Sequence, residues 1–235
     1  MKSLLVFLFT TFLSQSFGQT VINDKNVEVR NVTSFSGIKV FGGIDVYLSQ
    51  ADDYALAVSA SEDKYRDAIK TEVHNGILTI SYEGGSFNFT SDRNLRAYIS
   101  FKTLESLEGS GACDFKFSEK FKANSFRLKL SGACEINGFI EINNLDVTLS
   151  GASTVKVNGS VENIKVDASG ASDLKSYGLV ADNCVANLSG ASDVKITVNK
   201  SISVKASGAS ILHYKGNPDK KDINTSGASS VSQRD

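Results

Sequence analysis

Apolar and polar residues alternate along the second half of the chain, and the alternation restarts every 18–21 residues. Each restart is marked by the tripeptide Ser-Gly-Ala, which occurs seven times between Ser110 and Ala228. Counted from the Ser of each tripeptide, the fifth following residue is always apolar and the sixth is always polar. Alternation with a period of two is typical of a β-strand with one buried face. A repeat of about 20 residues predicts a solenoid in which every repeat forms one coil of a stack.

The Ser-Gly-Ala tripeptide falls between two alternating segments, which is the place of a tight corner. Gly permits positive φ angles there, and Ser and Ala are small enough for neighbouring corners to stack closely. We therefore predict an all-β protein, a right-handed parallel β-helix of about seven coils, with the hand taken from the general preference of parallel crossovers. The predicted structural corners are Gly111, Gly132, Gly151, Gly170, Gly190, Gly208 and Gly227.

The region before the repeats is also β-rich but has no fixed period. Residues 38–40 and 44–48 alternate around Gly42-Gly43 and predict two short strands joined by a turn. Asn75-Gly76 separates two further strand segments and predicts a two-residue hairpin, since a type I′ turn needs positive φ at both positions.

One short helix is predicted over residues 62–70. Ser59 and Glu62 have the spacing of a capping box, and the apolar residues of the helix are spaced so that they would face the sheet. We expect residues 19–103 to cap the solenoid of residues 104–235, with both parts forming one continuous domain.

The first 18 residues have the pattern of a secretory signal peptide. Lys2 supplies a positive charge, residues 4–13 form an apolar run, and the small residues Ser16 and Gly18 precede a cleavage point before Gln19. The apolar run is about half of the roughly 20 residues that a membrane-spanning helix requires. We therefore expect residues 1–18 to be removed, leaving an exported chain without a transmembrane segment.

The charge of the chain is nearly balanced, with 25 basic and 26 acidic residues. Nucleic-acid-binding domains carry clustered Lys and Arg, so no nucleic-acid partner is expected. Polar columns along one sheet face form a candidate binding face, and acidic Asp114 and Glu135 extend one of these columns. The alternative is a solvated ladder of mutually neutralising charges, which stabilises only modestly per pair. The candidate binding residues are Lys156, Lys175, Lys195, Asp173 and Asp193.

The three cysteines divide into two groups. Cys184 replaces larger apolar residues of a core column, so we expect it to be buried. Cys113 and Cys134 share one position in adjacent repeats, and export permits a disulfide between them. In-register parallel positions place Cβ atoms about 4.8 Å apart, longer than the roughly 3.5–4.5 Å that a disulfide prefers, so both states remain open.

The sequence lacks the known motifs in which residues carry out catalysis or bind metals. The two histidines are not at ligand spacing, and no nucleophile elbow, P-loop or HExxH occurs. Parallel β-helix lyases and hydrolases do use acidic and basic residues on one face. The repeat, however, shows no irregularity that would form a pocket. We expect no enzyme, no metal and no cofactor, with a glycan-active enzyme or a purely structural envelope component as alternatives.

Three stretches together resemble a known bacterial family. They are residues 35–46 (Phe-Ser-Gly-Ile-Lys-Val-Phe-Gly-Gly-Ile-Asp-Val), residues 75–80 (Asn-Gly-Ile-Leu-Thr-Ile) and the Ser-Gly-Ala repeats. They resemble the family called "putative auto-transporter adhesin, head GIN domain", over nearly all of residues 19–235. The resemblance implies a pectin-lyase-like superhelix with tight turns at Gly-Ser-Gly motifs. Only the first repeat carries that full motif, as Gly109-Ser110-Gly111.

The same resemblance implies an adhesive role without catalytic residues. The partner would be a cell-surface glycan or protein, and the location would be the periplasm, the outer surface or the medium. The last repeat is followed by only a few residues, so we expect no autotransporter stalk or membrane anchor. The oligomeric state remains open.

Overall fold

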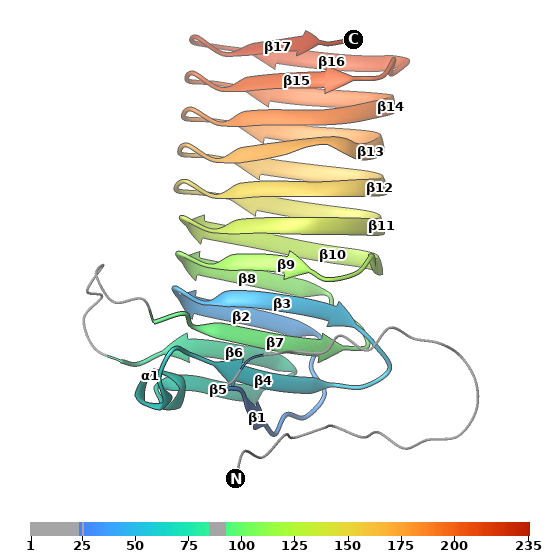
Figure 1. Ribbon diagram of the computed structural model, residues 1–235. Coiled ribbons are helices and arrows are strands. Elements are labelled where there is room, and N and C mark those ends of the chain that lie inside the picture. Colours follow the sequence, from blue (N-terminus) through green and yellow to red (C-terminus); the bar gives the residue numbers. More distant parts are fainter. Residues whose placement is uncertain (1–23, 25, 85–92) are drawn as a thin grey trace.

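The computed structural model describes residues 24, 26–84 and 93–235, so the predicted signal peptide lies outside the described residues. Within these ranges the chain is a parallel β-helix of about seven turns, built almost entirely from strands (Figure 1). The all-β solenoid predicted from the 20-residue period is confirmed. Within the described ranges, no helix has the length and apolar character needed to cross a bilayer.

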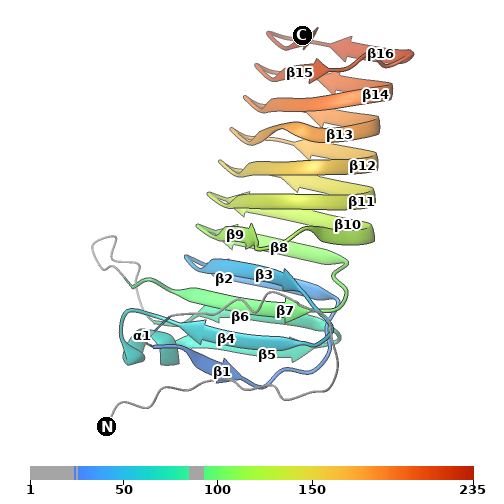
Figure 2. The same cartoon turned by 45° about the vertical axis from the view of Figure 1, so that its right-hand side comes forward.

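Each coil crosses two sheets, which we name the front sheet and the back sheet; they are joined at one end by the Ser-Gly-Ala corner and at the other by a bend (Figures 1 and 2). The front sheet contains β3 (Asp45–Gln50), β7 (Arg96–Phe101), β9 (Asp114–Phe117), β15 (Ile211–Lys215) and β17 (Ser230–Gln233). The back sheet contains β2 (Gly37–Gly42), β6 (Ile77–Tyr82), β8 (Ser106–Gly111) and β16 (Lys220–Thr225). Five long strands pass around the bend into the back sheet: β10 (Phe121–Gly132), β11 (Glu135–Leu149), β12 (Thr154–Ala168), β13 (Asp173–Leu188) and β14 (Asp193–Ala206).

The corners stack because their backbones approach one another closely. All seven corner glycines have positive φ, from 69° at Gly227 to 95° at Gly111. A Cβ atom on Gly151 would lie only 2.5 Å from the carbonyl oxygen of Gly132 in the coil below. That same oxygen accepts a hydrogen bond from the amide of Ala152 at 2.7 Å. The corner therefore needs glycine for two independent reasons, its left-handed backbone and the absence of a side chain.

Apolar burial holds the two sheets together. The fifth residue after each corner Ser is at most 1% exposed in six coils, from Phe115 to Leu212. Complete burial of such side chains stabilises by about 1.5–3 kcal/mol each, measured against exposure to water. Near the start of the regular repeats, Phe117, Phe121 and Phe126 pack ring against ring, with centroids 4.8–6.3 Å apart.

The bend has its own ladder of asparagine side chains. The amide of Asn163 donates to Asn144 at 3.0 Å, and that of Asn183 donates to Asn163 at 3.0 Å. The ladder ends where Ser201 donates to Asn183 at 2.7 Å. Stacked amides thus reinforce, at the bend, the main-chain pairing of the same residues.

The N-terminal strands do not stack in sequence order. The coil formed by β2 and β3 lies between the β6–β7 coil and the β8–β9 coil and pairs in parallel with both. Gly42 is in register with Gly111, so Phe41-Gly42-Gly43 adds one more stacked corner. At this end of the molecule β1 (Glu28–Arg30), β4 (Ala55–Ser59) and β5 (Ile69–His74) pair antiparallel with their neighbours. The predicted hairpin at Asn75-Gly76 is confirmed between β5 and β6.

The helix is shorter than predicted, and the capping box is wrong. Helix α1 covers Asp63–Asp67, its N-cap is Glu62, and no side chain caps it. Ser59 instead ends β4, where its buried hydroxyl donates to the carboxylate of Asp24. Ile69, predicted as the last apolar contact of the helix, begins β5. Pairing of β5 with β6 therefore overrides the local helical signal.

At the other end, a charged side chain takes a core position in the last coil. Lys221 is aligned with buried Ile202 of the coil below. Its Nζ donates to Oε1 of Gln233 at 3.3 Å and lies 5.8 Å from the ring centroid of Tyr214, so it spans the gap between the two sheets. An inward-pointing charge on an edge strand opposes the addition of a further strand.

Candidate binding face

The outer surface of the front sheet carries the residues predicted to form a binding face. Side chains alternate along a strand, so the fourth, sixth and eighth residues after each corner Ser point outward. In-register pairing of β13 with β14 places Asp173 beside Asp193 and Lys175 beside Lys195. Lys156 holds the equivalent position on the preceding strand, β12. All five predicted residues therefore lie on one face.

Each of the three lysines is ion-paired. The Nζ atoms of Lys156, Lys175 and Lys195 lie 2.8, 2.6 and 2.8 Å from a carboxylate oxygen of Glu135, Asp173 and Asp193 respectively. The hydrogen bond with Asp193 raises the pKa of Lys195. Partly exposed pairs of this kind contribute at most about 1 kcal/mol each. Their main effect is to make this face electrically neutral over short distances.

Three carboxylates are stacked on neighbouring strands at one end of the same face. Asp45, Asp114 and Glu135 are in register on β3, β9 and β11. Burial, followed by repulsion from Glu135 and Asp45, raises the pKa of Asp114, and burial also raises the pKa of Asp45. A hydrogen bond from Lys156 lowers the pKa of Glu135. Adjacent carboxyl groups whose pKa values move apart are suited to general acid–base catalysis.

The regularity expected from the sequence fails at β13. The register of β13 shifts against β12 between Val155 and Gly159, and against β14 between Ser176 and Val180. The hydroxyl of buried Ser176 accepts a hydrogen bond from the amide of Val157 at 3.1 Å and donates to the carbonyl of Val155 at 3.4 Å. This is a β-bulge in which a side chain satisfies main-chain groups that leave the ladder.

Two aromatic residues of this face were not predicted from the sequence, and one of them lies at the bulge. Phe139 is 55% exposed on β11, and Tyr177 follows the bulged Ser176 on β13. Both are the eighth residue after a corner Ser, in a column that is otherwise polar. The signal available in the sequence was an aromatic residue at an even, outward-facing position.

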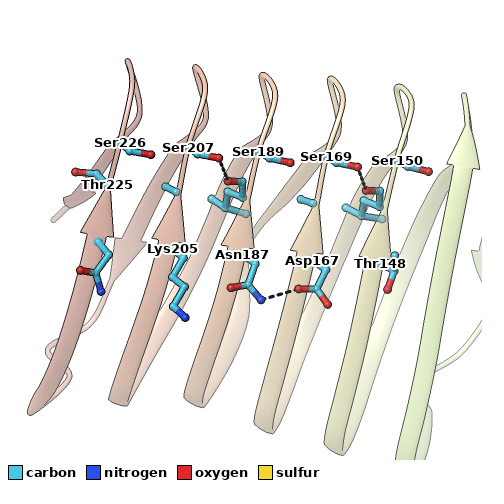
Figure 3. Close-up of a pocket in the computed structure, with 15 residues that line it drawn as sticks. Thr148, Ser150, Asp167, Ser169, Asn187, Ser189, Lys205, Ser207, Thr225 and Ser226 are labelled. Atoms are coloured by element: carbon cyan, nitrogen blue, oxygen red, sulfur yellow. Dashed lines mark hydrogen bonds between the residues drawn. The ribbon is translucent and has the colours of Figure 1, made fainter.

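The back sheet carries two grooves that the sequence did not predict. One, of about 600 Å³, follows the corner serines from Ser150 to Ser226, and within it Asn187 donates to Asp167 at 2.7 Å (Figure 3). The other, of about 870 Å³, lies toward the bend and includes Arg127 and exposed Val185. Neither contains a residue of the predicted face, nor the Asp114 and Glu135 carboxylates.

The cysteines are all buried free thiols. The sulfurs of Cys113 and Cys134 lie 3.3 and 3.2 Å from the carbonyl oxygens of Ser110 and Ser131 in their own corners. The hydrogen bond between the two thiols raises the pKa of Cys113 and lowers the pKa of Cys134 to about 7. A disulfide between them stays a prediction. Burial raises the pKa of Cys184 to about 12.

Metal ligands do not gather anywhere in residues 24, 26–84 and 93–235. No group of three or more His, Cys, Asp or Glu side chains in these ranges is arranged to hold an ion.

Solved structures from Bacteroides and Parabacteroides species have the same fold. A "putative adhesin" from Bacteroides fragilis superposes with a TM-score of 0.82 at 19% identity, covering 90% of this chain and 98% of that one. A "putative lipid binding protein" from Parabacteroides distasonis gives 0.68 at 20% identity, with coverage of 90% and 98%. A "putative adhesin" from Parabacteroides merdae gives 0.66 at 15% identity, with coverage of 91% and 97%. At these identities the likeness shows the fold.

Family membership rests on a separate comparison. No curated protein matches the chain. A family model described as "Putative auto-transporter adhesin, head GIN domain" matches residues 34–218, from just before β2 to the turn before β16. Since this match covers most of the sequence, including six of the seven Ser-Gly-Ala corners, the chain belongs to that family.

Proposed function

We propose that this protein is a non-enzymatic, exported envelope protein that binds a cell-surface glycan or protein through its front sheet. The observation that carries the proposal is the stack of three ion pairs held in register on one exposed sheet face. Membership in a family named for adhesins supports a binding role. The signal-peptide pattern of residues 1–18 supports export to the periplasm, the outer surface or the medium.

The rigidity of the solenoid favours recognition by such a face. The strands β12, β13 and β14, which carry this face, are each paired on both sides, and Lys156, Lys175 and Lys195 are already held by their carboxylate partners. Side chains that are ordered before association lose less conformational entropy when a partner binds. A repeating surface also presents the same groups at a fixed spacing along the axis.

Charge reversal on the two sheets tests the proposal. The fluorescently labelled protein is titrated onto bacterial and epithelial cells, and compared with a front-sheet variant carrying Lys156→Glu, Lys175→Glu and Lys195→Glu. We expect the variant to lose about tenfold or more in cell binding, because each change places a carboxylate beside an existing one. A matched control carries Lys129→Glu, Lys165→Glu and Lys205→Glu on the back sheet and should bind normally. Equal binding by both variants would place the site elsewhere, and no binding by the unaltered protein would refute the proposal.

Export has its own test. The full chain is expressed in a bacterium, fractionated and subjected to N-terminal sequencing of the product. We expect a mature chain that begins at Gln19 and is found outside the cytoplasm. An uncleaved cytoplasmic product would refute export while leaving the binding experiment intact.

A glycan-active enzyme is the second candidate, on one specific observation. Asp114 and Glu135 lie on adjacent strands with pKa values moved in opposite directions. Envelope and plant polysaccharides incubated with the folded protein should release no oligosaccharides if the binding proposal is right. Release that disappears in an Asp114→Asn variant would favour the enzyme. Self-association without any cell or glycan binding would favour a purely structural role.

A further inference from the structure

A column of mixed aromatic and polar residues, exposed at Phe139 and Asn158 and half-buried at its other members, runs beside the ion pairs of the front sheet. Its members are the eighth residues after five successive corner serines, and we name it the aromatic strip: Phe139, Asn158, Tyr177, Thr197 and Lys215. Phe139 is 55% exposed, although it occupies a position that is polar in the coils above. One exposed aromatic is ordinary on a protein surface, so the inference depends on what surrounds it.

The position of Tyr177 is fixed by the bulge in β13. Ser176 anchors the bulge from the inside through its hydrogen bonds to Val155 and Val157. The hydroxyl of Thr197 donates to the carbonyl of Tyr177 at 2.8 Å. On the outside, Nζ of Lys215 lies 5.5 Å from the centroid of the Tyr177 ring. Bulges commonly re-aim a side chain at a functional position, and this one orients an aromatic ring on the outer face.

A free amide lies on the strand between those of the two rings. Asn158 is in register with Phe139, its exposed side chain lies against Gly178, the residue after Tyr177, and it makes no hydrogen bond to any residue that the structure describes. An amide offers two donors and two acceptor sites. Neighbouring strands are about 4.8 Å apart, so the strands of Phe139 and Tyr177, two steps apart in the stack, are separated by roughly 10 Å. The strip therefore alternates an apolar ring, a hydrogen-bonding amide and a second ring.

The charge of the surroundings argues for a neutral ligand. Lys175 and Lys195, which flank the strip, are both held by aspartates, and Lys215 lies over Tyr177. Lys215 has no carboxylate partner among the described residues, but its cation lies over the Tyr177 ring, and a single cation of this kind does not make the positive patch that an anionic polymer needs. The core of a protein interface is depleted of charged residues, whereas Lys175, Lys195 and Lys215 all lie beside Tyr177. Sugar rings present apolar C–H faces, suited to the negative face of an aromatic ring, and hydroxyl edges suited to an amide.

We propose that the aromatic strip binds a neutral, hydroxyl-rich glycan chain, with sugar rings packed on Phe139 and Tyr177 and hydroxyl groups at Asn158 and Thr197. This inference rests on the proposed function and names the ligand class of the same face. The glycan runs along the solenoid axis, because the strip does so.

Affinity electrophoresis tests the proposal with defined probes. The protein is run through gels containing mannan, xylan or a β-glucan as neutral probes, and polygalacturonate as an anionic probe. We expect at least one neutral probe to retard the protein, and a Phe139→Ala/Tyr177→Ala variant to lose about tenfold or more in affinity. Phe41→Ala is the matched control, since Phe41 is 40% exposed on the stacked corner of the N-terminal coil. Asn158→Ala should weaken retardation with no change in thermal stability.

The outcomes separate this inference from the binding role itself. Retardation that the double variant leaves unchanged, or retardation by polygalacturonate alone, would overturn the glycan strip. If the double variant still binds cells and no neutral probe retards the protein, the aromatic strip does not bind a neutral glycan, while the proposed function stands. Cell binding lost in the double variant and also abolished by protease treatment of the cells would identify a protein partner instead. Equal thermal unfolding of variants and parent protein shows that losses reflect contact and not misfolding.

Discussion

The two ends of each coil both turn the chain from one sheet to the other, but they do so in different ways. At the corner, seven copies of one tripeptide turn the chain with positive φ glycines, and each Ala amide bonds to a Gly carbonyl one coil below. At the bend, the chain turns through residues of varied type and number, and stacked asparagine side chains are added to main-chain pairing that continues between the coils. The corner interrupts the strands and is held by Gly and Ala main-chain groups, whereas the bend keeps its strands and adds a side-chain ladder.

This difference explains where the repeats of the chain differ from one another. A side chain at a corner glycine would collide with the neighbouring carbonyl, so this position is glycine in all seven corners. The bend and the adjoining half of the front sheet tolerate an extra residue, and the bulge in β13 occurs there. Features that could recognise a partner are therefore found away from the corners, on a scaffold that the corners keep in register.

The largest expected effect comes from giving a corner glycine a side chain. Gly151→Ala should lower the free energy of unfolding by about 3 kcal/mol or more, because it combines a left-handed backbone with a steric clash. Gly76→Ala is a matched control, since Gly76 has the same φ of 73° but no atom within 4 Å of an added Cβ. The control should lose only about 1–2 kcal/mol. Equal losses in urea unfolding would show that stacking adds nothing to the demand for glycine.

Breaking the asparagine ladder at the bend should lower the free energy of unfolding by a smaller amount. Asn163→Ala removes two side-chain hydrogen bonds and should cost about 1–2 kcal/mol. Asn187→Ala, near the corner end of the same sheet, removes a single exposed hydrogen bond to Asp167 and should cost less than about 0.5 kcal/mol. Urea unfolding of both variants compares the two ends directly. A cost as large for Asn187 as for Asn163 would mean that the bend does not depend on its ladder.

The sequence predicted the corner side of the fold well and the bend side poorly. Alternation and the 20-residue period specify strands, buried columns and stacked corners, because these follow from spacing alone. The β2–β3 coil was read as strands and a turn, but its insertion between two later coils depends on contacts between distant segments. The helix was overextended because β-pairing of Ile69 outweighs local propensity.

The candidate site, too, could be predicted only in part from the sequence. The spacing placed Lys175, Lys195 and their aspartates on one face. The pairing of each lysine with a particular carboxylate depends on rotamers, and the bulge at Ser176 depends on one inward-pointing hydroxyl among apolar residues. The grooves of the back sheet depend on how far the corners project, which the residue pattern does not encode.

Strict register at the corner also forces like charges together, and this has a pH-dependent consequence. Burial and the neighbouring carboxylates raise the pKa of Asp114, so its contribution favours folding at acid pH and is lost as pH rises through its folded-state pKa. Asp114→Asn should therefore stabilise the protein at neutral pH, by less than about 1 kcal/mol because the carboxylate is exposed. The gain should vanish at acid pH in urea unfolding followed across pH.

Glu135→Gln, one strand away, should behave in the opposite sense. The hydrogen bond from Lys156 lowers the pKa of Glu135, so its contribution is present above the ordinary glutamate pKa and is lost as pH falls through the folded-state value. The variant should be less stable at neutral pH and equal to the parent in acid. The same sign for both variants would show that the shared column, and not each side chain's own partners, determines the two pKa values.

The smallest expected effect tests whether the corner demands only a backbone shape or also a particular hydrogen bond. Later corners place Ser where the first two place Cys, and Ser153 donates to the carbonyl of Ser150 at 3.1 Å. The sulfur of Cys134 lies 3.2 Å from the equivalent carbonyl of Ser131, so Cys134→Ser should change the free energy of unfolding by less than about 0.5 kcal/mol.

Cys184→Ser is the contrast, because Cys184 is a core residue with no hydrogen-bond partner among the residues described. A hydroxyl there would be buried without a partner and should cost about 1–3 kcal/mol. If the two substitutions lower the free energy of unfolding equally, the hydrogen bond to the corner carbonyl does not explain why Ser recurs at this position.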